Sequence, residues 1–135
     1  MKKILVILSY IIFFFNSNVL TSEKNNILKV GLLAPLSGKY AELGNSLLYS
    51  LQLALAEIND KNIFIIPKDA GFNDKNKLET AIKEIKSEGA NVIIGPISND
   101  EFSIVKKFNN TIFISPSNIS PDFEGNIISV GISLE

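Results

Sequence analysis

Short, almost continuous apolar runs recur along this 135-residue chain, and they constrain its fold more than any other feature. Strands with one face in water alternate apolar and polar residues, whereas these runs are apolar at nearly every position. They therefore predict the strands of a parallel sheet that is covered on both faces. The five runs are residues 27–34, 63–66, 92–94, 112–114 and 127–130.

The segments between the runs have the apolar spacing of helices. We expect a first helix over residues 44–59, a second that begins after Asn73 or Asp74 and ends at Gly89, and a short third from Asn99. Strand two is expected to stop at Pro67. Alternating strands and helices predict an α/β fold, a doubly wound parallel five-stranded sheet of order 2-1-3-4-5. The apolar residues at helical spacing in the first helix are Leu43, Leu47, Leu51, Ala54, Leu55 and Ile58. The residues expected to be buried on the second and third helices are Leu78, Ala81, Ile82, Ile85, Phe102, Val105 and Phe108.

The composition excludes several classes of function. The chain has no Cys and no His, so we expect no zinc site of the usual kind, no disulfide, no lipid anchor on Cys and no Ser-His or Cys-His catalytic pair. Its 13 basic and 14 acidic residues give a net charge of -1, without the basic face of a nucleic-acid binder. The acidic residues lack the spacing of a metal loop, and we interpret them as helix starts and solvated loops. We therefore expect a protein that is not an enzyme and has no cofactor.

The N-terminus has the pattern of a secretory signal peptide. Lys2 and Lys3 precede an apolar run over residues 4–15, and a polar stretch follows. The run is shorter than the roughly 20 residues that a membrane-spanning helix needs. We predict a signal peptide over residues 1–22, cleavage before Glu23, and a mature domain over residues 23–135 that lies in the periplasm, free of the membrane. The alternative is an uncleaved signal anchor.

The predicted strand order places a candidate ligand site at the carboxyl ends of the strands. In such sheets ligands bind where the strand order reverses, here between strands one and three. The loops in question cover residues 35–40, 95–99 and 115–118, and they are rich in hydroxyl and amide groups. Two interpretations stay open, namely ligand contacts or helix caps and turns. The candidate residues are Ser37, Tyr40, Ser98, Asn99, Ser115 and Ser117.

An ordered set of motifs resembles a known superfamily. The set comprises residues 29–38 (KVGLLAPLSG), 53–59 (LALAEIN), 92–96 (VIIGP), 114–117 (ISPS) and 121–123 (PDF). It is similar to the type I periplasmic solute-binding proteins of the leucine/isoleucine/valine-binding class, over nearly all of residues 27–135. Within the superfamily, the segments LLAPLSG, IPKD and IIGP look most similar to penicillin-binding protein activators.

The resemblance implies one lobe of a two-lobed binding protein, with the ligand in the cleft between the lobes. The sequence stops about where the fifth strand of the first lobe would end, and we expect it to be a fragment of a longer protein; a truncated gene product is the alternative. In amino-acid binders a Ser at the start of helix three holds the ligand carboxylate; here Asn99 aligns with it, beside Ser98. Ser117 matches a position that holds the ammonium group, but Ile119 stands where a Thr should.

The resemblance also implies the function and the partners. We expect an exported module that binds a small polar ligand such as an amino acid and serves an ABC permease. The alternative is an activator domain that regulates a peptidoglycan synthase through protein contacts. Because Ile119 has no hydrogen-bonding group, an ammonium ligand would lose a partner there, and this favours the alternative.

Overall fold

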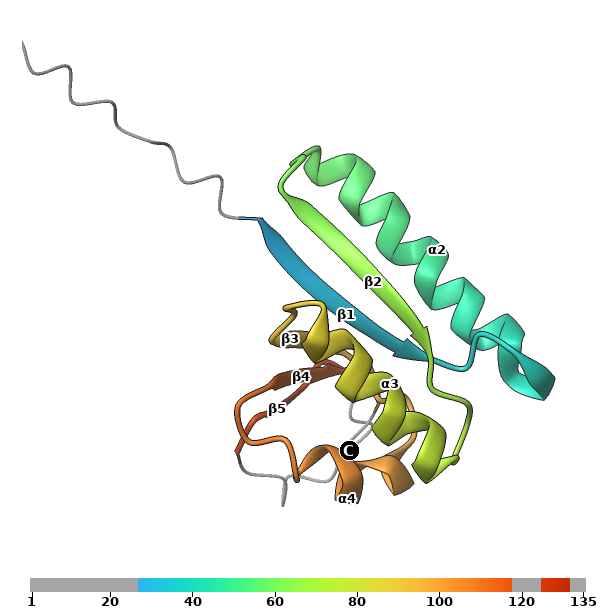
Figure 1. Cartoon of the computed structure of the whole chain (residues 1–135). Helices are drawn as coiled ribbons and strands as arrows, with labels where there is room; N and C mark the ends of the chain where they lie inside the picture. The colour runs from blue at the N-terminus through green and yellow to red at the C-terminus, as the bar shows by residue number, and fades with distance from the viewer. Residues whose placement is uncertain (1–26, 118–124, 132–135) are drawn as a thin grey trace, which may run out of the picture.

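Five parallel strands form one sheet in the order β2-β1-β3-β4-β5, which confirms the predicted α/β fold and strand order (Figure 1). The computed structural model describes residues 27–117 and 125–131. The signal peptide predicted over residues 1–22 therefore lies outside the described residues, as does Ile119. The strands are β1 (Leu28–Ala34), β2 (Ile63–Asp69), β3 (Val92–Ile94), β4 (Ile112–Ser115) and β5 (Ile127–Ser129).

The helices alternate with the strands as the apolar spacing predicts. Figure 1 shows α2 alongside β1 and β2, and α3 and α4 close together at the other side of the sheet. Within the described residues, no helix is both long enough and apolar enough to cross a membrane. The helices are α2 (Ala41–Ile58), α3 (Lys75–Ser87) and α4 (Phe102–Val105), with two 3-10 turns, η1 (Gly38–Tyr40) and η2 (Asn99–Glu101).

The main hydrophobic core lies between the sheet and the helices α3 and α4. Ile85 of α3 packs so closely on β1 that a Cβ added at Gly31 would lie 2.5 Å from its Cγ2 atom. In register with Gly31, Ile93 and Phe113 face the same side of the sheet, and both are fully buried. The predicted buried face of α3 is confirmed, with Leu78, Ala81, Ile82 and Ile85 all in the core.

The opposite face of the sheet is less well covered. Residues that follow or precede the core positions by one point to this side. Of these, Ile112 is 47%, Ile128 52% and Val130 62% exposed. The face of the sheet away from α3 therefore presents aliphatic side chains to solvent over β4 and β5.

Helix α2 packs closely against the loop after β1 at one point, but it buries few of its side chains. Gly44 is its only buried residue, and a Cβ there would lie 2.2 Å from the carbonyl oxygen of Pro35. Of the apolar residues whose spacing predicted this helix, Leu43 is 47% and Ile58 59% exposed, and Ala54 is exposed as well. The apolar spacing identified the helix but not its orientation, because nearly every face of α2 carries apolar residues.

Three boundaries also differ from the prediction. Helix α2 begins at Ala41 rather than at residue 44, directly after η1. Strand β2 does not stop at Pro67 but continues to Asp69. Since β2 is an edge strand, a residue without an N–H can be accommodated where its nitrogen faces the free edge. Helix α4 ends at Val105, so Phe108 lies beyond it, where it packs half-buried against the core.

The close approach at Gly44 gives a test of this packing. We expect Gly44→Ala to lower the free energy of unfolding by about 2 kcal/mol, because the added methyl group meets a backbone carbonyl that cannot turn away. Helix propensity alone would predict the opposite, a gain of roughly 1 kcal/mol. Urea denaturation measures the difference. The control is Gln52→Ala at an exposed position of the same helix, and a Gly44→Ala variant more stable than wild type would contradict the packing.

Candidate functional site

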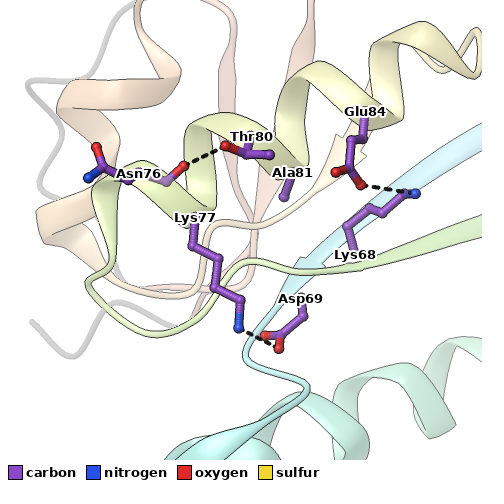
Figure 2. A pocket seen from close by; sticks show the side chains of 7 residues that line it. All are labelled: Lys68, Asp69, Asn76, Lys77, Thr80, Ala81 and Glu84. Carbon is purple, nitrogen blue, oxygen red and sulfur yellow. Dashed lines mark hydrogen bonds and ion pairs between the residues drawn. The ribbon is translucent and has the colours of Figure 1, made fainter.

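Asp69, the last residue of β2, joins the loops at the carboxyl edge of the sheet. Its carboxylate accepts hydrogen bonds from the backbone N–H of Leu36 at 3.0 Å, from the N–H of Gly71 at 3.1 Å, and from the hydroxyl of Ser37. Lys77 of α3 adds an ion pair of 2.6 Å between Nζ and Oδ2 (Figure 2). The prediction that the acidic residues are helix starts and solvated loop residues is therefore wrong for Asp69. Its carboxylate connects β2 to the loop after β1 and to α3.

The electrostatics of Asp69 follow from these contacts. Partial burial by itself would raise the pKa of the carboxyl group, but the bonds from Lys77, Ser37, Gly71 and Leu36 outweigh it and hold the pKa well below its usual range. The group is thus ionised at neutral pH. The carboxylate of Asp69 therefore retains the bonds from all of these donors, and this charged group fixes the loop that carries Ser37.

A second cluster joins the loops after β2 and β3. The hydroxyl of Ser98 donates to Oδ1 of Asn73 at 2.6 Å, and the backbone N–H of Asn73 donates to Oε1 of Glu101 at 2.9 Å. Asn73 has a φ of 57°, the left-handed region that Asn tolerates better than most residues. Burial raises the pKa of Glu101, against the lowering effect of backbone N–H bonds from Asn73 and Ser98.

A third cluster joins the loops after β3 and β4. The hydroxyl of Ser117 donates to Oδ1 of Asn99 at 2.5 Å. Ser115 is fully buried and donates to the carbonyl oxygen of Pro96 at 2.7 Å. Its oxygen also accepts the backbone N–H of Ser117 at 3.2 Å. The position of Ser117 is thus set by Ser115 at the end of its own strand and by Asn99 of the loop after β3.

The sequence-predicted residues do not meet at one point, and two of them bond to residues that were not predicted. Ser98 contacts Asn73, and Asn99 contacts Ser117, whereas Ser37 faces Asp69. Tyr40 is 41% exposed and stacks on Phe72, with ring centroids 4.1 Å apart.

The helix-cap interpretation fails for the side chain of Ser98, which makes no capping bond to η2. Sequence reasoning missed Asp69, Asn73 and Glu101 as members of the network. The spacing Ser-x-x-Glu over residues 98–101, which is that of a capping box, is the signal that could have identified Glu101.

A surface hollow of about 410 Å³ lies between the end of β2 and helix α3. Figure 2 shows the side chains that line it. Its charged groups are paired with one another. Lys68 lies 3.2 Å from a carboxylate oxygen of Glu84 and 2.8 Å from one of Glu88, and Lys77 pairs with Asp69. With both lysines engaged, the hollow is explained by ion pairs that fasten α3 to the edge strand. The lining residues are Lys68, Asp69, Asn76, Lys77, Thr80, Ala81 and Glu84.

The lowered pKa of Asp69 predicts how stability depends on pH. A carboxyl group whose pKa is depressed by folding stabilises the protein above its ordinary pKa of 3.8, and this contribution is lost as the pH falls below that value. We expect Asp69→Asn to lower the free energy of unfolding by about 2 kcal/mol at pH 7, because the amide loses charge-assisted bonds. The difference from wild type should shrink in acid.

Denaturant titrations at several pH values measure this effect. Glu57→Gln removes an exposed carboxylate of α2 and is the control. An Asp69→Asn variant that loses equal stability at pH 7 and at pH 2 would show that the charge of Asp69 is not what stabilises the loops.

Comparisons with known proteins agree with the fold. Residues 27–131 match the periplasmic binding protein family. An uncharacterized protein of Methanocaldococcus jannaschii is 28% identical over 112 residues, which is 75% of this chain and 27% of that protein.

Two solved structures are similar to the chain in fold. The branched-chain amino acid transporter substrate-binding protein LivJ of Streptococcus pneumoniae, in complex with isoleucine, has a TM-score of 0.58 at 22% identity over 70% of this chain and 30% of LivJ. Full-length LpoA of Haemophilus influenzae has a TM-score of 0.63 at 20% identity over 80% of this chain and 20% of LpoA. The chain spans less than a third of the length of each of these relatives. Because the family match extends over residues 27–131 and the parallel sheet corresponds to one lobe of the same fold, this chain belongs to the periplasmic binding protein family.

Proposed function

We propose that the chain is the ligand-binding N-terminal lobe of an exported, non-catalytic solute-binding protein that takes a small polar ligand such as an amino acid. The observation that carries the proposal is the contact between Asn99 and Ser117 at the carboxyl ends of β3 and β4. Hydroxyl and amide groups from two loops meet there, so one polar group of a ligand can exchange hydrogen bonds with both. The isoleucine complex of LivJ, a protein of the same fold, supports this class of ligand.

The remaining candidate residues differ in whether we propose that they contact the ligand. Ser98 lies next to Asn99 and carries a half-exposed hydroxyl group. Tyr40, which is 41% exposed, stacks on Phe72 at the loop after β1, and the ammonium group of Lys39 lies over its ring 5.5 Å from the centroid. Ser115 is fully buried and supports Ser117 from behind, and Ser37 is engaged by Asp69; neither is proposed to touch the ligand directly. The proposed partner is an ABC permease, and the proposed location is the periplasm.

A second function is favoured by two observations. The chain has the fold of LpoA over 80% of its length, and Ile119 replaces the hydroxyl residue that the resemblance requires for an ammonium ligand. In this alternative the domain is a penicillin-binding protein activator, which contacts a peptidoglycan synthase through its surface. The loops at the carboxyl edge would then be turns without a ligand.

Ligand binding can be tested by calorimetry with isoleucine. We expect residues 23–135 to bind weakly or not at all, because small ligands need enclosure that a single lobe does not provide. We expect micromolar binding by the product of the complete gene, and a loss of about tenfold in affinity in its Asn99→Ala and Ser117→Ala variants, about 1.4 kcal/mol. Ser50→Ala is the matched control, since that hydroxyl bonds only to the carbonyl of Ser46 on α2.

The outcomes separate the two functions. Micromolar binding by residues 23–135 alone would refute the requirement for enclosure. Reduced stability with unchanged affinity in Asn99→Ala would identify Asn99 as a structural turn residue. If the product of the complete gene binds no amino acid but retains a purified peptidoglycan synthase, the activator function replaces the transport function.

Export is tested separately by mass spectrometry of the protein recovered from the periplasm of an expressing bacterium. We expect a mature N-terminus near Glu23, because the apolar run over residues 4–15 is too short to remain as a membrane-spanning helix. The substitution Leu8→Lys should block processing, since the charge interrupts the apolar run. A protein that retains residues 1–15 in the inner membrane would show a signal anchor instead.

A further inference from the structure

Glu101 is a buried acidic residue that the proposed ligand contacts do not include. It is only 4% exposed. Its Oε1 atom accepts the backbone N–H of Asn73, 28 residues earlier in the chain, at 2.9 Å, and the backbone N–H of Ser98 also lowers the pKa of the carboxyl group. A single side chain therefore joins the loop after β2 to the loop after β3.

Local sequence explains half of this arrangement. Ser98 precedes η2 and Glu101 is the third residue of that turn, which is the spacing of a capping box. The backbone N–H of Glu101 donates to the carbonyl oxygen of Ser98 at 3.2 Å, but the hydroxyl of Ser98 makes no capping bond to η2. That hydroxyl donates instead to Oδ1 of Asn73 at 2.6 Å. The hydroxyl of Ser98 therefore bonds to the neighbouring loop rather than to the start of η2.

Asn73 is held at two points by the same pair of residues. Its backbone N–H bonds to Glu101, and its side-chain oxygen accepts from Ser98. Its positive φ of 57° is uncommon for a residue other than glycine, so the surrounding contacts must select it. Asn73, Ser98 and Glu101 are thus connected to one another between two loops, and the carboxylate of Glu101 is the buried member of the set.

We propose that Glu101 is a positioning residue, whose carboxylate clamps Asn73 to Ser98 and thereby holds Asn99 beside Ser117. The inference rests on the ligand site proposed above and deepens it. Asn99 directly follows Ser98, and its Oδ1 atom lies 2.5 Å from the hydroxyl of Ser117. With the loops fixed in advance, binding does not have to order them, and the ligand retains affinity that ordering would otherwise cost.

Holding the two loops together with a buried carboxylate carries a free-energy cost. Burial raises the pKa of Glu101, which means that folding disfavours its ionised form relative to water. A neutral side chain of the same shape removes this burial cost, which offsets part of the free energy lost with its hydrogen bonds. A glutamine, however, offers one acceptor oxygen and an NH₂ group to two N–H donors, so it cannot hold both loops equally well. Stability and loop order should consequently respond differently to the substitution Glu101→Gln.

Residue-resolved amide hydrogen exchange on the ligand-free chain tests the clamp without reference to any ligand. In Glu101→Gln we expect the amides of Asn73 and Ser98 to exchange at least tenfold faster, while the amides of β1 and β3 keep their rates. Wild-type rates at Asn73 and Ser98 would overturn the proposal. A fall in midpoint with faster exchange throughout the sheet would also overturn it, because Glu101 would then serve general stability. Glu57→Gln on α2 is the control.

A second variant tests the bond between Ser98 and Asn73. Asn73→Gly keeps the positive φ and the backbone N–H but removes the acceptor of Ser98, and it should speed exchange at the Ser98 amide severalfold; an unchanged rate would overturn the clamp. In the product of the complete gene, Glu101→Gln should weaken isoleucine binding about tenfold, and wild-type affinity would overturn the positioning role. If the wild-type protein binds no isoleucine, the proposed ligand fails, whereas the exchange rates still decide whether Glu101 clamps the loops.

Discussion

The packing of α3 against the centre of the sheet is the contact on which the rest of the structure depends. Ile85 lies on Gly31 of β1 so closely that no side chain fits between them. Around this contact the fully buried residues Ile93 and Phe113 continue the core into β3 and β4. Because all the strands are parallel, the core that aligns them also brings their carboxyl ends, and the loops that follow, to one edge.

The two faces of the sheet are covered unequally, and this has a physical consequence. The face toward α3 is buried over its central strands, whereas Ile112, Ile128 and Val130 on the other face are about half exposed or more. Continuous apolar strands are typical of sheets that are buried on both sides. The exposed aliphatic side chains form an apolar surface over β4 and β5, of the kind through which proteins make contacts.

At the carboxyl edge, the polar groups are bonded to one another rather than left open. Two carboxylates organise the edge and have opposite electrostatics. Asp69 gathers a lysine, a hydroxyl and two backbone N–H groups, and its pKa is lowered. Glu101 is more deeply buried among backbone donors, and its pKa is raised. One carboxylate is stabilised by its partners, whereas the other bears a burial cost for its place between two loops, and such a cost is common where a site needs fixed geometry.

The sequence by itself determined which segments form strands and helices, the order of the strands, and the buried face of α3, because apolar spacing and continuous apolar runs are local patterns. It did not determine how α2 is turned, since nearly all faces of that helix are apolar, or that β2 continues through Pro67, which depends on β2 being an edge strand. The candidate loops were identified correctly as neighbours, but the partners of Asp69 and Glu101 lie as far as 33 and 28 residues away in the chain. Only the tertiary structure decides such pairs, because a hydrogen bond depends on distances and directions that no local pattern encodes.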